Sequence, residues 1–598
     1  MAAKARCAAS CDAMSRGLAV VTAGFLAAAA ISLLHRVLGG VVLSSQLLSV
    51  LSLCGGFVAG YVLLCRAGSG AAALQTGSRP DPVALGVACV GVLLVFATYW
   101  GSETGIGGDY RMHRMYAYQL LNGFAETHEP YTGVSGHYPP LVHTLLALGV
   151  QVTGLTLHYV MLGLSAIVSA GVAVVAVRVG VGIGLGVLGA RFLSALLIVW
   201  GGAWVFELRE FQLYLPAVQL AMPFLARNLA LLLLLLAMDV GLRASQGRLS
   251  PRAAAWVAGC VVGLMGLTRP WEFGVGLLGL LFVATCRRPR EGWLSVGIAL
   301  VLSAIYWLPL AIDWLELGIH ASREVARSTD LPTSPFLYLP LLPLLGLAIV
   351  DRAEMTGFLR AVSLLVVGLL GVPVMALGAG WVGLGETAGL QGGLIKLERV
   401  GQLLALGLFA IASFGLQRVS VRWGQTLASI VALLFVGLGL ATTLRVTGYF
   451  LDGQSVLLSP RWARAPHYVT DLAGSPFYLR HLLDDPRAVV IVPSALGHMT
   501  ASRNGVEVIY SHQAAPIWLD GPFDGRPQEL RRSAVDRFYQ MLERGAVDGG
   551  VLDAYGARHF VWPNRSPAAL ENVTALGDVG SFGGMTWELL RVGPPITE

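Results

Sequence analysis

Long apolar segments separated by short polar loops recur along most of the chain. Leu229–Met238 and Ile430–Leu440, for example, contain no charged residue. A bilayer core about 30 Å thick requires about 20 apolar residues in each spanning helix, and this sequence supplies such segments repeatedly. Because a soluble fold could not bury that many uncharged stretches, the pattern predicts a polytopic α-helical membrane protein.

The apolar segments predict about thirteen transmembrane helices. They lie near residues 18–34, 42–64, 82–100, 157–177, 192–206, 218–240, 253–268, 273–286, 294–312, 333–350, 361–382, 400–416 and 424–444. Residues 139–155 are apolar but interrupted, and we expect them to form a helix along the outer interface. The first segment follows a basic N-terminus, a pattern that is also typical of a signal peptide. We interpret it as a retained transmembrane helix, because the topology described in the next paragraph requires this helix.

Arginine residues occur mainly in alternate short loops, and such residues bias a loop to the cytoplasmic side of a membrane. With the N-terminus in the cytoplasm, every predicted inner loop is basic. These loops contain Arg178 with Arg191, Arg243 with Arg248 and Arg252, Arg287 with Arg288 and Arg290, Arg352 with Arg360, and Arg418 with Arg422. Arg227 is an exception, because it falls inside a predicted span. An odd number of spans places the C-terminus outside, in a multi-pass protein of the cell membrane.

The composition changes to that of a soluble domain after about residue 451. Residues 488–493 and 559–562 have the pattern of short buried strands. Residues 527–544 have helical periodicity, with apolar side chains expected on one side at Leu530, Val535, Phe538 and Leu542. Strands alternating with a helix predict an α/β domain. We therefore divide the chain into a transmembrane domain at 1–450 and an extracytoplasmic α/β domain at 451–598.

Composition and missing motifs narrow the function. Only 13% of the 598 residues are charged, about half the share in soluble proteins. The net charge of +6 reflects cations in short loops, so we expect no nucleic-acid partner. All seven cysteines precede residue 287, so no disulfide holds the C-terminal domain together. Motifs for nucleotide-phosphate binding, zinc peptidases and serine hydrolases are absent from the sequence.

The predicted outer loop at 101–140 carries the most informative cluster of polar side chains. Glu103 and Asp109 lie just beyond the end of the predicted third span. A carboxylate there can act as a general base toward a sugar hydroxyl if it lies within hydrogen-bond reach. The alternative is a solvated loop in which the acidic residues pair with the neighbouring basic residues.

The order of residues in this loop resembles the first outer loop of GT-C superfamily glycosyltransferases. Asp109-x-Arg111 is followed by aromatic residues and a Leu-Leu-Asn-Gly turn, and then by Tyr138-Pro139-Pro140 leading into an apolar helix. The layout, many spans followed by an outer α/β domain, is also similar, as is the stretch Asp-Ala-Tyr-Gly-Ala-Arg-His-Phe-Val at 553–561. Within the superfamily, the loop is most similar to the arabinofuranosyltransferases of actinobacterial cell walls.

The resemblance implies a GT-C-like fold and an enzyme that transfers a sugar from a polyprenyl-phosphate donor to a glycan or glycolipid acceptor of the cell envelope. Arabinofuranose is the sugar that the nearest similarity implies, and inversion is the expected stereochemistry. Asp109 is implied as the catalytic base, with Glu103 as the alternative. Arg111, His137 and Tyr138 are expected to bind substrate. The partners would be the donor, the acceptor and membrane lipids.

Charged residues at the outer ends of other spans fit the same site. Lys396 and Arg399 are three residues apart and hence on one helical face, where two cations could hold the donor phosphate. The alternative is snorkelling of both side chains to the headgroups. Arg269, Trp271 and Glu272 lie in a short outer turn, where they could stack on and hydrogen-bond a sugar. The alternative is anchoring at the membrane interface.

The sequence leaves two further possibilities, a divalent-cation site and a transporter function. Glu103 and Asp109 offer oxygen ligands that suit Mg²⁺ or Mn²⁺, but two carboxylates are too few to predict a metal site. A transporter or flippase of lipid-linked saccharides would share the spans and the phosphate site without needing a base. Transporters often contain internal repeats. The sequence contains no such repeat, so we favour a glycosyltransferase.

Overall fold

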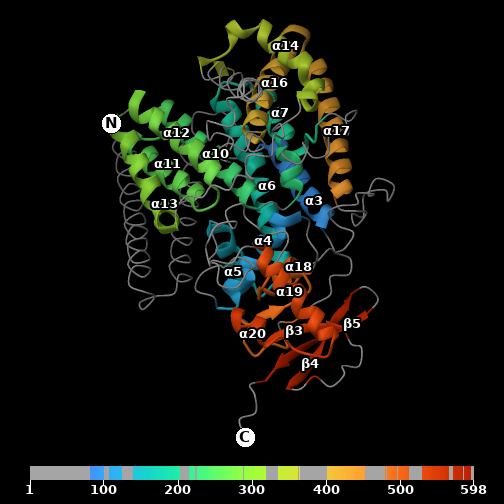
Figure 1. Ribbon diagram of the computed structural model, residues 1–598. Helices are drawn as coiled ribbons and strands as arrows, with labels where there is room; N and C mark the ends of the chain where they lie inside the picture. Colours follow the sequence, from blue (N-terminus) through green and yellow to red (C-terminus); the bar gives the residue numbers. More distant parts are fainter. Residues whose placement is uncertain are drawn as a thin grey trace, which may run out of the picture.

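The computed structural model consists of a helical bundle with an α/β domain at one end (Figure 1). The structure describes residues 81–99, 107–123, 139–202, 215–222, 225–286, 289–317, 335–357, 359–360, 363, 401–450, 479, 481–485, 487–494, 496–510, 528–563, 570, 572–582 and 585–593. The predicted spans near 18–34 and 42–64, and nearly all of the one near 361–382, lie outside these residues.

Most of the predicted spans that the structure covers coincide with helices. The helices of the bundle are α3 (Pro82–Tyr99), α6 (Leu157–Gly182), α7 (Val187–Val199), α9 (Pro216–Ala221), α10 (Leu225–Ser245), α11 (Pro251–Gly266), α12 (Pro270–Cys286), α13 (Pro289–Leu317), α14 (Leu342–Val350), α16 (Gly401–Trp423) and α17 (Gln425–Phe450). Five helices in the described part of the chain, α6, α10, α13, α16 and α17, are long and apolar enough to cross a membrane. The chain is thus a polytopic helical protein, and the count of thirteen transmembrane helices stays a prediction.

Two predicted spans are not single α-helices. The segment 218–240 is divided, because α9 ends at Ala221 and Met222 is extended (φ −93°, ψ 130°). Met222 precedes Pro223, and a residue before proline avoids the helical region. The segment 333–350 begins as a 3₁₀ helix, η2 (Pro335–Leu341), and becomes α-helical only in α14. Proline at position 340 lies inside η2, where it cannot donate a backbone hydrogen bond.

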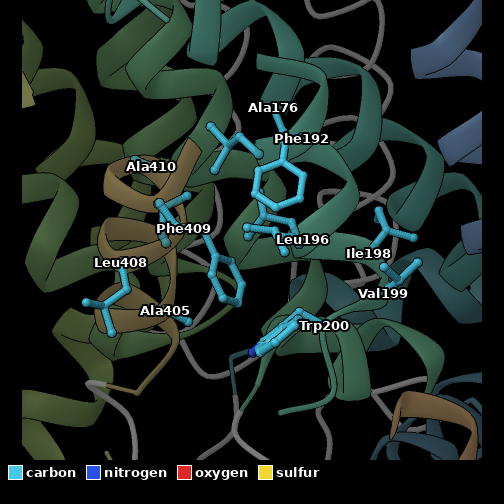
Figure 2. Close-up of a cluster of buried hydrophobic side chains, with 14 of the residues drawn as sticks. Ala176, Phe192, Leu196, Ile198, Val199, Trp200, Ala405, Leu408, Phe409 and Ala410 are labelled. Atoms are coloured by element: carbon cyan, nitrogen blue, oxygen red, sulfur yellow. The ribbon is translucent and has the colours of Figure 1, made fainter. Parts of the chain in front are cut away.

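The bundle core lies between α7 and α16. Phe192 and Leu196 of α7 and Trp200, which follows α7, belong to one apolar cluster with Ala405 and Phe409 of α16 (Figure 2). All five are buried. Apolar burial stabilises by about 25 cal/mol for each Å² removed from water, and within a bilayer close packing takes over much of that role.

The basic loops predicted to be cytoplasmic meet at one end of the bundle, opposite the α/β domain. Arg191 at the start of α7 lies 2.9 Å from Asp81, which precedes α3. Near the ends of α6 and α10, Arg178 lies 2.5 Å from Asp239. Asp351, after α14, pairs with two arginines near the end of α16. The helices therefore alternate in direction as the scheme requires. Which end faces the cytoplasm stays a prediction.

The C-terminal domain is a five-stranded mixed sheet with helices. Its elements are β1 (Val489–Ile491), α18 (Gly497–Asn504), β2 (Glu507–Val508), α19 (Gln528–Glu543), α20 (Gly549–Tyr555), β3 (His559–Pro563), β4 (Val573–Phe582) and β5 (Met585–Val592). The strand order is β2-β1-β3-β5-β4; β1 pairs in parallel with β2 and β3, while β5 is antiparallel to β3 and β4. The two predicted strands are β1 and β3, and the predicted helix is α19.

The predicted apolar side of α19 was wrong at one position. Val535, Phe538 and Leu542 are buried, but Leu530 is 57% exposed. Arg531, four residues before Val535, takes the inward position instead. Its guanidinium donates to the carbonyl of Ile509 at 3.3 Å, and its aliphatic stem can cover apolar surface.

Candidate functional site at the domain end of the bundle

The predicted outer loop at 101–140 contains a helix, α4 (Gly107–Leu121). Asp109 lies in its first turn, where the helix dipole favours a carboxylate. A turn at Asn122 and Gly123 ends the helix, with Gly123 at a φ of 82°. The sequence did not predict this helix within the outer loop, although the predicted Asn-Gly turn is confirmed. Glu103 lies outside the described residues, and of Asp109 and Arg111 only the backbone is described.

A pair of histidines joins α4 to the next helix, α5 (Leu141–Thr153). His113 Nδ1 and His143 Nε2 are 2.7 Å apart, so one nitrogen donates and the other accepts. Both rings are buried, and Tyr116 packs against His143 with ring centroids 4.7 Å apart. Burial, and secondarily the neighbouring His113, hold the pKa of His143 well below its ordinary value. The His143 ring is thus held in its neutral form. Asp109, four residues before His113, occupies the same side of α4.

The start of α5 contacts the turn between α11 and α12, which the sequence also singled out. The Leu141 amide donates to the Leu267 carbonyl at 2.9 Å, and the two side chains share an apolar cluster. Two segments more than 120 residues apart in sequence therefore meet at this end of the bundle. His137 and Tyr138, just before α5, lie outside the described residues.

The turn between α11 and α12 holds a buried ion pair. Arg269 Nη1 donates to Glu272 Oε1 at 2.7 Å, and each side chain is 6% exposed. Because both are enclosed by protein, the alternative of anchoring to headgroups does not fit Arg269. Of Trp271, in the first turn of α12, only the backbone is described.

Two buried polar atoms, one in this ion pair and one on a tryptophan that contacts the next residue, have no hydrogen-bond partner among the described residues. Among the residues that the structure describes, Glu272 Oε2 has no hydrogen-bond partner. Trp307 of α13 stacks on Phe273, the residue after Glu272, with ring centroids 6.4 Å apart. Within the same described set, its indole N–H also lacks a partner. A buried carboxylate oxygen and a buried N–H without partners are costly, and a hydroxyl can both donate to the first and accept from the second.

Lys396 and Arg399 lie outside the described residues, but the start of the helix that follows them is placed. Gln402, in the first turn of α16, donates to the side chain of Gln219 in α9. Asn228 of α10 donates to the Gln219 backbone carbonyl at 2.7 Å. These three buried amides form a polar contact among α9, α10 and α16. The role of Lys396 and Arg399 stays a prediction.

Several of these residues were not predicted from the sequence. His143, Gln219, Asn228 and Trp307 were not selected, because each lies in an apolar segment and the residue that it contacts lies in another helix. An isolated polar residue inside an apolar run was the available signal.

For a metal, the described part of the chain contains no group of three histidine, cysteine, aspartate or glutamate side chains that could hold an ion. The Mg²⁺ or Mn²⁺ ligands considered from the sequence, Glu103 and Asp109, have side chains that lie outside the described part of the structure.

Comparisons with known proteins were made at three levels. No family model matches the sequence, and no curated protein matches it. Among solved structures, the arabinofuranosyltransferase AftD from mycobacteria is similar at 16% identity and a TM-score of 0.49, covering 86% of this chain and 41% of its own. ArnT from Cupriavidus metallidurans, solved with undecaprenyl phosphate, is similar at 15% identity and a TM-score of 0.47, covering 85% and 97%.

An oligosaccharyltransferase from Archaeoglobus fulgidus is similar at 14% identity and a TM-score of 0.35, covering 80% of this chain and 68% of its own. The chain spans less than half the length of AftD. None of these TM-scores reaches 0.5. Two of these neighbours are, by name, an arabinofuranosyltransferase and an oligosaccharyltransferase.

Proposed function

We propose that the chain is a membrane glycosyltransferase that transfers a sugar from a polyprenyl-phosphate donor to a glycan or glycolipid acceptor on the outer face. One observation carries this proposal. The hydrogen bond from Leu141 to Leu267 brings the helices that follow the Asp109 segment against the turn that holds the Arg269–Glu272 ion pair. This contact supports the proposal, because it links the helix that follows the predicted outer loop to a turn selected for a different chemical reason.

In the proposed reaction, an acceptor hydroxyl oxygen attacks the anomeric carbon of the donor. The bond from that carbon to the phosphate oxygen breaks, and polyprenyl phosphate leaves with the electron pair. Asp109 takes the hydroxyl proton as general base. Lys396 and Arg399 hold the phosphate as its negative charge develops. Attack on the face opposite the leaving group inverts the anomeric centre.

The residues around the α11–α12 turn are proposed to bind the sugar. Glu272 Oε2 would accept a hydrogen bond from a sugar hydroxyl, and the Trp307 indole would donate one. Arg269 would fix the Glu272 carboxylate, and Trp271 would stack on the ring. Arg111, His137 and Tyr138 are proposed to complete the pocket. A sugar that satisfies buried polar groups is selected over one that lacks the matching hydroxyl.

The resemblance to arabinofuranosyltransferases makes arabinofuranose the first sugar to test, and the C-terminal domain is proposed to bind the acceptor. The test is an assay of the purified chain in lipid nanodiscs with a panel of polyprenyl-phosphate sugars, read by the mass of the acceptor product. A mass increase of one sugar residue with one donor is expected. If no donor gives a product while labelled donor crosses the bilayer of proteoliposomes, the transporter alternative replaces the enzyme.

A further inference from the structure

The helix that carries Asp109 is enclosed on two sides. On one side α5 contacts it through His113 and His143. On another, α4 packs against α18 of the C-terminal domain, and these two helices are adjacent in Figure 1. Met115 and Tyr116 of α4 have no exposed surface, because they belong to an apolar cluster whose other members come from the C-terminal domain. Part of the core of that domain is therefore supplied by α4.

Polar contacts fix the end of α4 to the same domain. The side-chain amide of Asn122 donates to the backbone carbonyl of Asn504 at 3.2 Å, across 382 residues of sequence. The Asn504 side chain is itself held, because its oxygen accepts from the Leu479 amide at 2.8 Å and its nitrogen donates to the Thr500 carbonyl at 2.9 Å. Arg487 donates to the carbonyl of Gly123. These contacts leave the end of α4 little freedom to shift.

Gly505 is the position of closest approach. It follows α18 with a φ of +68°. A Cβ atom there would lie 2.6 Å from the Cβ of Tyr118, 2.9 Å from its carbonyl carbon and 3.0 Å from the backbone nitrogen of Gln119. Two of these three atoms belong to the backbone of α4, so rotation of a side chain cannot relieve the contact. Any side chain at position 505 must displace α4.

A displacement at Tyr118 reaches Asp109 because both lie on one helix. Nine residues separate them, about 14 Å at 1.5 Å per residue. We propose that the C-terminal domain positions the first turn of α4, and that Asn504 and Gly505 are positioning residues for the transfer reaction. This inference rests on the proposed function, since it concerns where Asp109 stands relative to the acceptor. A misplacement of about 1 Å can cost about 10²-fold in rate.

The experiment compares Gly505→Ala with Gly556→Ala in the full-length protein. Gly556 follows α20 as Gly505 follows α18, with a φ of +61°, but a Cβ atom there meets nothing within 4 Å. Both substitutions therefore carry the same left-handed backbone strain, and only the first presses on α4. Three quantities are measured: kcat with KM for donor and acceptor, amide hydrogen exchange of residues 107–121, and the apparent unfolding temperature.

We expect Gly505→Ala to lower kcat at least tenfold with both KM values within about twofold, and to accelerate exchange in α4. Gly556→Ala should leave kcat and α4 exchange as in the wild type and should lower the unfolding temperature less than Gly505→Ala, because it carries the backbone strain without the clash. If Gly505→Ala does not fold, Asn122→Ala should give the same pattern more weakly. Wild-type exchange in α4 of Gly505→Ala, or equal loss of kcat in both glycine variants, overturns the inference. Absence of sugar transfer by the wild type refutes the proposed function, and α4 exchange still decides whether the domain holds the helix.

Discussion

His113 and His143 join α4 to α5 through two rings that are almost entirely buried. A buried polar group needs a partner, and the 2.7 Å contact supplies one for each ring. The nitrogen that accepts in this contact cannot take a proton without losing it. His143 could be identified in the sequence as a histidine inside an apolar segment, but its partner could not, because His113 lies 30 residues earlier in a polar stretch.

This pair makes stability depend on pH. The pKa of His143 is lowered mainly by burial, so the folded protein keeps the ring neutral while the unfolded chain protonates it near pH 6.5. The stability that depends on a neutral His143 is fully present above that pH and is lost as the pH falls below it. Between pH 7.5 and 5.5 the apparent unfolding temperature should fall less in His143→Gln than in the wild type. Some slope should remain, because burial also lowers the pKa of His559. Equal slopes in the two proteins would contradict this account.

The helix α11 packs against α13 through small residues. At Gly259, a Cβ atom would lie 2.7 Å from the carbonyl oxygen of Ser295 and 2.8 Å from the Cβ of Ile298. Glycine and other small residues let helix backbones approach closely in membranes. The spacing of glycines along α11 was visible in the sequence, but the helix that fills the space was not, because α13 follows only after the whole of α12.

A pair of substitutions tests this contact. Gly259→Ala should destabilise the protein by about 1–3 kcal/mol, because the added methyl group overpacks a backbone contact. Gly297→Ala is the matched control on α13, since a Cβ there meets nothing within 4 Å. The control should keep or slightly raise the apparent unfolding temperature in detergent, because alanine has the higher helix propensity. If both variants unfold at the wild-type temperature, α11 and α13 are not as close as described.

The elements that depend on local pattern were predictable, and those that depend on distant partners were not. Helices α6, α16 and α17 follow from apolar length, and β1 and β3 from short apolar runs. Helix α4 was not predicted within the outer loop, because its polar residues conceal the apolar positions, Met115 and Tyr116, that pack against the C-terminal domain. The buried position of Arg531 in α19 was not predicted, because its hydrogen-bond partner, the carbonyl of Ile509, lies outside the helix.

At the scale of the whole molecule, the alternation of helices leaves two chemically distinct ends. One end has arginines paired with Asp81, Asp239 and Asp351. The other carries α4, α5 and the C-terminal domain (Figure 1). Loops rich in arginine stay in the cytoplasm, so we expect the first end inside and the C-terminal domain outside.

Cysteine labelling tests this orientation. Glu354 in the short 3₁₀ helix η3 (Arg352–Glu354) and Glu543 at the end of α19 are both exposed, and they lie at opposite ends of the molecule. In a variant whose native cysteines are replaced by serine, Glu543→Cys should react with an impermeant maleimide in intact cells. Glu354→Cys should react only after permeabilisation. The reverse result would invert the topology and place the proposed site in the cytoplasm.

The most direct test of the central proposal is Asp109→Asn in the purified protein, with sugar transfer and donor binding measured separately. Asparagine keeps the size of the side chain but cannot take the proton, so kcat should fall roughly 10² to 10⁴-fold while donor binding survives. Glu103→Gln is the comparison, because an inactive Glu103→Gln beside an active Asp109→Asn would exchange the two roles and leave the enzyme class intact. Wild-type sugar transfer in both variants would contradict the proposal that this segment is catalytic.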